Sequence, residues 1–223
     1  MATKNGPFTV GEWYHCYNSS VDKRISFEDA KDYQRFLELL YLANDESPLR
    51  RNDLGARTFK EILALPRGKR LVAVGAFSLM PNRFDLVLNE SLPGGITAFM
   101  RKLGTAYTLY FNTRHERAGN LFLKPFRSRI ATPDRSLQQA IHYVHANPAV
   151  LYEPQWKIGH VVDPQFLEEH LTAYPYSSLG AYIRTQTPLR PILDTQWLST
   201  AHTVPLQRML REARIYSVDS GLS

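Results

Sequence analysis

The stretch RLVAVGAFSLMPNRFDLVL, residues 70–88, has the pattern of a β-hairpin. Its first half is rich in aliphatic residues, which favour a strand. Residues 80–82, Met-Pro-Asn, favour a tight turn because proline fixes φ and asparagine tolerates turn conformations. On the returning strand, the two-residue period places Arg83 and Asp85 on one face and the apolar residues 84, 86 and 88 on the other. We therefore expect an ion pair between Arg83 and Asp85 beside the sheet surface, of small stabilising value if it is exposed.

The residues on both sides of this hairpin predict alternating strands and helices. A strand is expected at 13–17, helices at 26–41 with Ser26 as N-cap, at 57–65 and at 96–110, an extended segment at 120–130, and a helix from Pro133 that Pro148 ends. Because hairpin and crossover connections both occur, the predicted fold class is α+β, an antiparallel sheet with helices packed on it. No linker is long enough to separate two independent domains, so we expect one domain with a C-terminal helical and irregular extension.

Composition excludes several classes of protein. With 223 residues, 43% of them hydrophobic and 22% charged, the chain is neither disordered nor fibrous. The longest apolar run, residues 71–80, is half of the roughly 20 residues that a membrane span needs, and the N-terminus lacks the apolar segment of a secretory signal. We expect a cytoplasmic protein without a membrane partner. The lone Cys16 excludes an internal disulfide and is expected to be a small buried hydrophobe.

The positive charge is concentrated in two windows. The net charge is +6, yet residues 101–135 alone carry +6 and residues 47–70 carry +5, so the rest of the chain is mildly acidic. Such clustering suits a polyanion, because each neutralised phosphate releases counterions. A solvated surface is the alternative interpretation, but aromatic residues interleave with the charges of the first window and could stack on unpaired bases. The sequence therefore favours nucleic-acid binding.

Three side chains of the predicted helix before Pro148 could carry chemistry. Tyr143 shares a helix face with polar residues four positions away on either side, so it is not obviously core. A tyrosine hydroxyl can attack a phosphodiester when a cation steadies the phosphate, although a partly buried structural tyrosine is the more common case. His142 and His145 are spaced to share one metal ion, but no third ligand is fixed. These two histidines, and His115 in the turn at 114–117, are expected to contact phosphate or solvent.

Six short motifs occur in an order that is informative: YHCYN at 14–18, AFSLMPN at 76–82, YFN at 110–112, RAGNLF at 117–122, YVHANP at 143–148 and YPYSS at 174–178. The series resembles the single-tyrosine HUH transposases, and among them the REP-associated tyrosine transposases. The resemblance covers residues 10–185 as a DNA-binding domain and leaves 186–223 as the C-terminal extension. It implies a ferredoxin-like domain that binds single-stranded or hairpin DNA and cuts it by tyrosine attack, leaving a 5′-phosphotyrosine.

The resemblance also assigns positions to the catalytic site. Tyr143 matches the nucleophile, and Asn147 lies next to the metal site in relatives. The two metal-binding histidines of the family are replaced here by Arg83 and Asp85. Arginine is always protonated and has no lone pair to give a metal, although its guanidinium could bind phosphate directly. We therefore expect no metal or other cofactor, with Mg²⁺ or Mn²⁺ required only if the family activity is retained.

The sequence leaves three functions open. The favoured one is a DNA-binding protein of the transposase family with an impaired nuclease centre, and the alternative is an active transposase or nickase that acts through Tyr143. A partner-binding subunit without nucleic acid is disfavoured by the basic windows. RNA is an alternative ligand, and the protein is expected to be a monomer or a homodimer. The predicted DNA-binding residues are seven of the eight cations of the first window, Arg101, Lys102, Arg114, Arg117, Lys124, Arg127 and Arg129.

Overall fold

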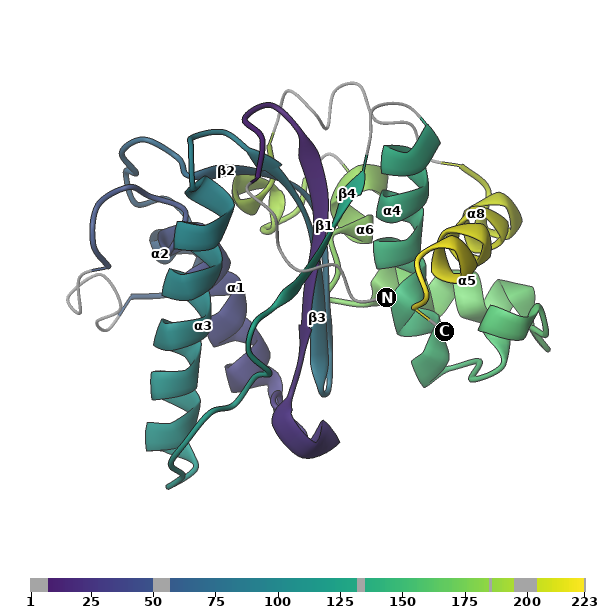
Figure 1. The fold of residues 1–223 in the computed structure, drawn as a ribbon. Helices are drawn as coiled ribbons and strands as arrows, with labels where there is room; N and C mark the ends of the chain where they lie inside the picture. Colours follow the sequence, from purple (N-terminus) through teal and green to yellow (C-terminus); the bar gives the residue numbers. More distant parts are fainter. Residues whose placement is uncertain (1–7, 50–56, 132–134, 185, 195–203, 223) are drawn as a thin grey trace.

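A four-stranded antiparallel sheet separates two layers of helices (Figure 1). The computed structural model describes residues 8–49, 57–131, 135–184, 186–194 and 204–222. Its strands are β1 (Trp13–Ser19), β2 (Val72–Met80), β3 (Arg83–Glu90) and β4 (Arg127–Ala131), in the spatial order β2-β3-β1-β4. This order, with one helical crossover between β1 and β2 and another between β3 and β4, is that of the ferredoxin-like fold. The predicted α+β class is confirmed.

The hairpin forms where the sequence predicts it. Strands β2 and β3 pair in register from Met80 opposite Arg83, so that residues 81 and 82 make the connection. Strand β3 also pairs with β1 and is therefore central in the sheet. Its alternation turns Phe84, Leu86 and Leu88 toward one core and Val87 toward the other. The ion pair between Arg83 and Asp85 on the Val87 face is present.

The helices of the two crossover connections cover one face of the sheet. Helix α1 (Ala30–Leu42), the short α2 (Phe59–Ile62) and the long α3 (Gly95–Arg114) lie together on that side, as Figure 1 shows. The core beneath them is aromatic, with Phe36 packed against Phe84, Tyr107 and Phe122. The expected start of the first helix at Ser26 is wrong. The carboxylate of Asp29 accepts the amide hydrogens of residues 31 and 32 and is the N-cap, because only there does the chain turn into helical geometry.

The opposite face is covered by the helices that follow β4. These are α4 (Arg135–Ala146), α5 (Pro164–Ala173), α6 (Leu179–Ile183) and α8 (Leu206–Asp219), with 3₁₀ turns at Asn147–Leu151 and Trp156–Ile158. Two further 3₁₀ turns, at Val21–Lys23 and Arg190–Ile192, lie elsewhere in the chain. Helix α8 packs along α4 and contributes Leu210 and Ala213 to a second core around Val144. The expected helix start at Pro133 and part of the 47–70 basic window lie outside the described residues. Helix α4 ends at Ala146, just before Pro148, as predicted. The chain continues directly as the 3₁₀ turn Asn147–Leu151.

A buried carboxylate fixes the start of α3. Glu90 accepts hydrogen bonds from the amide of Ile96 (2.7 Å) and from the amide of Gly95 (3.1 Å), which also donates to the carbonyl of Leu92 (2.8 Å). A side chain at residue 95 would collide with the carbonyl oxygen of Leu71. Glycine is therefore required where α3 leaves the sheet.

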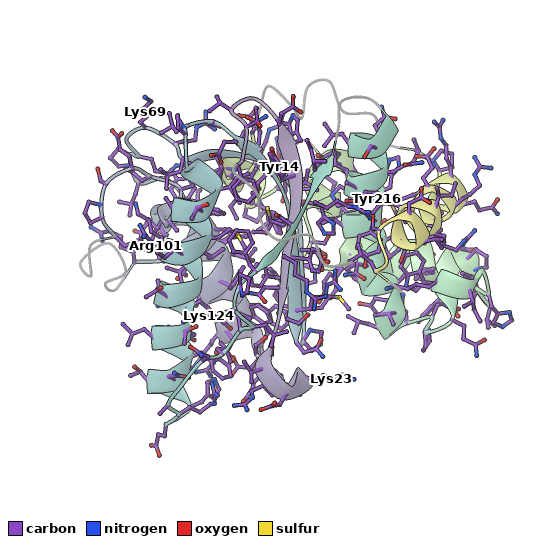
Figure 2. All side chains as sticks on the ribbon, viewed as in Figure 1. Tyr14, Lys23, Lys69, Arg101, Lys124 and Tyr216 are labelled. Carbon is purple, nitrogen blue, oxygen red and sulfur yellow. The ribbon has the colours of Figure 1, made fainter. Side chains whose placement is uncertain are left out.

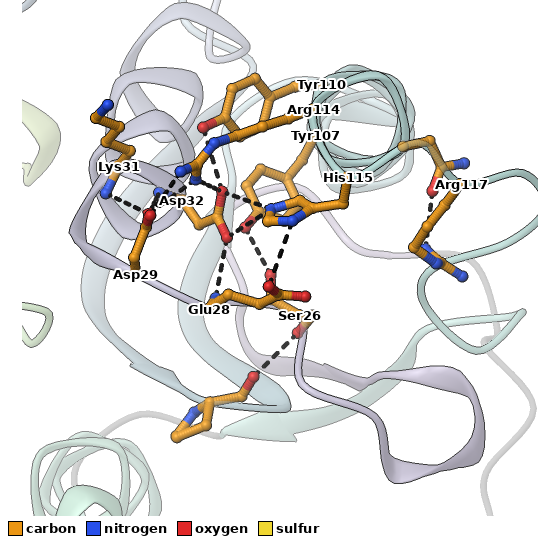
Figure 3. A network of polar contacts seen from close by, with 12 residues as sticks. Ser26, Glu28, Asp29, Lys31, Asp32, Tyr107, Tyr110, Arg114, His115 and Arg117 are labelled. Carbon is orange, nitrogen blue, oxygen red and sulfur yellow. Dashed lines mark hydrogen bonds and ion pairs between the residues drawn. The ribbon is translucent and has the colours of Figure 1, made fainter.

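A polar network joins the start of α1 to the end of α3 (Figure 3). The fully buried Asp32 accepts from Arg114, from Tyr110 (3.2 Å) and from the ring nitrogen of His115 (3.1 Å). The other side of His115 faces Glu28 at 3.3 Å. The expectation that His115 contacts solvent or phosphate is wrong, because its ring nitrogen is hydrogen-bonded to the buried carboxylate of Asp32 on α1.

In the described part of the chain, no helix is long and apolar enough to cross a membrane.

Candidate functional site

The carboxylate of Asp85 is the centre of a polar site between the sheet and α4. It accepts from Nε and Nη2 of Arg83, both at 2.6 Å, from Nε2 of His15 at 2.9 Å and from Nδ2 of Asn147 at 3.0 Å. Asp85 is fully buried, which alone would raise its pKa. The Arg83 charge and the hydrogen bonds from His15 and Arg83 outweigh burial and hold the pKa of Asp85 well below its usual range. Asp85 is therefore ionised, and each of its two carboxylate oxygens accepts two hydrogen bonds.

Arg83 lies at the open edge of this site. Its guanidinium lies over the ring of Tyr17, 4.7 Å from the centroid, and its side chain remains 21% exposed. Of the five N–H donors of an arginine, the two bonds to Asp85 use two. The remaining donors are available to an anion that approaches the first residue of β3.

His15 connects the site to α8. The pKa of His15 is lowered by burial despite the neighbouring Asp85, so the ring is neutral at neutral pH. A carboxylate can only accept, so we assign the ring hydrogen to Nε2, which leaves Nδ1 to accept from the hydroxyl of Tyr216 at 3.3 Å. A chain of hydrogen bonds thus runs from Tyr216 through His15 to Asp85.

Tyr143, the expected nucleophile position, lies inside the second core. Its side chain is 0% exposed, and its hydroxyl makes no hydrogen bond with any described residue. The ring packs 5.6 Å from that of His15 and 5.7 Å from that of Tyr216, and Nζ of Lys157 lies 5.6 Å from its centroid. Burial raises the pKa of Tyr143, although Arg83 opposes this. The interpretation that Tyr143 is not core is wrong, because α8 covers the helix face that the local sequence pattern leaves open.

The two histidines of α4 point to different partners. Nδ1 of His142 lies 2.6 Å from Glu212 of α8, whereas Nε2 of His145 lies 2.8 Å from the hydroxyl of Ser178. Burial and the neighbouring His142 lower the pKa of His145 to about 3, so it is neutral. Within the described ranges, no three His, Cys, Asp or Glu side chains are arranged to hold a metal ion. Cys16 is buried, as expected.

The seven cations predicted to bind DNA lie in two layers. Arg127 and Arg129 lie opposite Tyr17 and His15 in the β1–β4 ladder and share their sheet face. The others lie on α3 or in the segment that follows it, and Figure 2 shows Arg101 and Lys124 on the far side of the sheet from Tyr216. Three of the seven have intramolecular partners there: Lys102 bonds to the carbonyls of residues 45–47, Arg114 to two aspartates, and Arg117 to Asn112. The structure therefore does not bring all seven together.

Four side chains of the site were not singled out from the sequence: His15, Tyr17, Lys157 and Tyr216. The first two alternate along β1 and could have been found, because alternation places them on the same face as their ladder partners 87 and 85. Burial and the neighbouring charge of Arg83 lower the pKa of Lys157, which lies on a 3₁₀ turn far from β3 in the sequence. No local pattern links Lys157 or Tyr216 to this site.

A comparison with solved structures finds a related fold. The structure of a REP-associated tyrosine transposase bound to a REP hairpin matches this chain with a TM-score of 0.51, over 85% of this chain and 90% of that one, at 10% sequence identity. No family model matches the sequence, and no curated protein does. At this identity the likeness establishes the fold, and function has to be argued from the site.

Proposed function

We propose that this protein binds single-stranded or hairpin DNA on the sheet face that carries Arg83, and that it does not cleave DNA by a metal-assisted route. The observation that carries the proposal is the buried pair between Arg83 and Asp85, at the two positions where the transposases that the sequence resembles have histidines. The hairpin-bound transposase of the same fold supports the choice of ligand.

The side chains at these two positions do not fit a divalent cation. Arg83 is itself a cation and has no lone pair. Asp85 already receives four donors, so a metal would have to displace His15, Asn147 or Arg83 from a buried carboxylate. The buried Tyr143 hydroxyl is in addition protonated and covered. The donor set at this site therefore does not support a metal-assisted attack by Tyr143.

The same arrangement suits an anionic strand. Arg83, Arg127 and Arg129 lie on one sheet face, and the ammonium of Lys157, which donates to the carbonyl of Leu222 at 3.0 Å, is near enough to Arg83 for the two charges to repel. Tyr17 is half-buried among them, with the Arg83 guanidinium over its ring and the His15 ring centroid 5.0 Å away. Phosphate contacts by these cations and contact of a base with the exposed part of the Tyr17–Arg83 pair together describe a surface for unpaired nucleotides.

The binding half of the proposal is tested by fluorescence anisotropy with a labelled DNA hairpin at increasing salt. Replacing Arg127 and Arg129 by alanine is expected to reduce the slope of log affinity against log salt by about 1.4, because each single-strand phosphate contact contributes about 0.7. The control is Lys31→Gln with Lys60→Gln, two exposed cations of the opposite layer. An RNA hairpin serves as the competing ligand. A flat salt dependence, or equal loss in the control, would overturn the proposed surface.

The cleavage half is tested by searching for a covalent protein–DNA adduct on a denaturing gel. We expect none with Mg²⁺, with Mn²⁺ or with chelator. An adduct that forms with Mg²⁺, disappears with chelator and is lost in Tyr143→Phe would show that the protein is an active transposase or nickase. The double variant Arg83→His with Asp85→His is the matched attempt to restore the metal ligands, with manganese-dependent nicking as its readout.

A further inference from the structure

A row of arginines follows the outer side of α8. Arg208, Arg211 and Arg214 are spaced by three residues, which places neighbours in the row on adjacent turns of the helix. All three line a groove of about 520 Å³, whose other wall includes Gly159, Val161 and Pro164.

The three arginines differ in how many hydrogen bonds and ion pairs their guanidinium groups make within the described part of the chain. Arg211 makes no hydrogen bond or ion pair with any part of the chain that the structure describes, and it is exposed. Arg214 has a single long bond, 3.5 Å, to the carbonyl of Trp156. Arg208 donates to Glu212 at 2.8 Å but remains 53% exposed, and Glu212 is also held by His142. The groove therefore has more positive charge than its own helix neutralises.

The row is continuous with the sheet surface described above. Arg214 bonds to the carbonyl of Trp156, and the ammonium of the next residue, Lys157, lies over the ring of Tyr143, near enough to Arg83 for the two charges to repel. At the other end of α8, Arg129 of β4 donates to the carbonyl of Asp219 at 2.7 Å. Acidic groups on the segments that form the groove include Glu212, Asp219, Asp163 and Glu153; Asp163 caps α5, and Glu153 accepts from the amides of residues 162 and 163. Cations thus follow one another from Arg83 at the start of β3, across the 3₁₀ turn that carries Lys157, to α8.

We propose that the α8 groove is a second nucleic-acid contact, which holds the sugar–phosphate backbone of the single strand that leaves the sheet face. This inference rests on the proposed function and extends it. Arginines in a groove without an aromatic lining offer contacts to phosphate but no platform for base stacking, so the contact is independent of base sequence. The α8 groove contributes to affinity only when the ligand is long enough to reach from the sheet face to α8.

The test compares a minimal DNA hairpin with the same hairpin carrying a single-stranded flank. For Arg211→Gln with Arg214→Gln, affinity for the flanked hairpin is expected to fall about 25-fold at 0.1 M salt, because two contacts each contribute a factor of about 5 relative to 1 M. The salt slope is expected to fall by about 1.4, and affinity for the minimal hairpin to stay unchanged. Arg211→Gln alone, which disturbs no described contact, is expected to give half of the change in slope.

The outcomes separate this inference from the proposed function. If the unaltered protein binds neither ligand, the proposed function fails and the groove fails with it. If it binds both and the α8 variants weaken both equally or neither, the groove is not a strand contact although the sheet surface stands. If Lys31→Gln with Lys60→Gln weakens the flanked hairpin as much, the effect is one of net charge and the groove is again excluded. Unchanged thermal unfolding of the variants is the check that they are folded.

Discussion

Replacing Asp85 by asparagine is expected to destabilise the protein strongly. The substitution keeps the shape of the side chain but removes the charge that pairs with Arg83, and it turns an amide N–H₂ toward a donor. Removal of one partner from a buried ion pair costs about 3–5 kcal/mol. The pair qualifies, because Asp85 is 0% and Arg83 only 21% exposed. With an m-value of about 2.5 kcal/mol per M, the urea midpoint should fall by about 1–2 M.

The expected loss depends on pH in a defined direction. Asp85 has a folded pKa below the ordinary value of 3.8, so its ionised form contributes stability above that value. As pH falls below about 3.8 toward the depressed folded pKa, the unaltered protein loses this contribution and the difference from Asp85→Asn shrinks. Urea unfolding of both proteins at pH 7, 5 and 3.5 measures this difference in the free energy of unfolding.

The matched control is the exposed pair of Arg24 and Asp22, which has the same two-residue spacing. Its aspartate side chain is 75% exposed, so Asp22→Asn should change stability by less than about 1 kcal/mol. A loss below about 1 kcal/mol for Asp85→Asn at pH 7, or a loss that does not shrink in acid, would refute the description of Asp85 as a buried, ionised hub.

Four further substitutions, two around the site and two on α3, test the packing by chemical denaturation. Ser178→Ala should cost about 1–3 kcal/mol, because it leaves the buried ring nitrogen of His145 and the amide of Phe77 without their partner; no change would show that these two groups have another hydrogen-bond partner. Tyr216→Phe should cost about 1 kcal/mol by removing the donor to His15 and should leave hairpin affinity unchanged, and a large loss of affinity would contradict this. Gly95→Ala should destabilise through its collision with Leu71, whereas Gly104→Ala, which meets no atom within 4 Å, should stabilise by about 1 kcal/mol; equal effects would exclude the close approach.

The local elements could be predicted from the sequence, and the exact N-cap of α1 could not. Alternation in 83–88 identifies the strand and the shared face of Arg83 and Asp85, because a strand has only two faces. Ser26 and Asp29 are both good capping residues, so composition alone cannot choose between them. The choice depends on where the chain turns after its contact with Pro81, where the amide of Ser26 donates to the carbonyl at 2.8 Å.

The candidate site could be predicted only in part, because its pieces come from distant segments. The pattern on α4 shows Tyr143 among polar neighbours, but nothing within that helix reveals that α8 will cover them. Glu212 of α8 pairs with His142, and Tyr216 packs on Tyr143. Polar residues on the covered face find partners on another helix, and a polar pattern is therefore a poor guide to exposure.

The hydrogen bond between Tyr216 and His15 joins residues 201 positions apart in the chain. Closing a loop of that length costs about 5 kcal/mol of chain entropy, against about 2 kcal/mol for a loop of ten residues. Contacts of such high sequence separation slow folding, because the entropy is spent before the packing energy is recovered. We therefore expect the α4 layer to assemble late in folding, after the β2–β3 hairpin, which is closed by two residues.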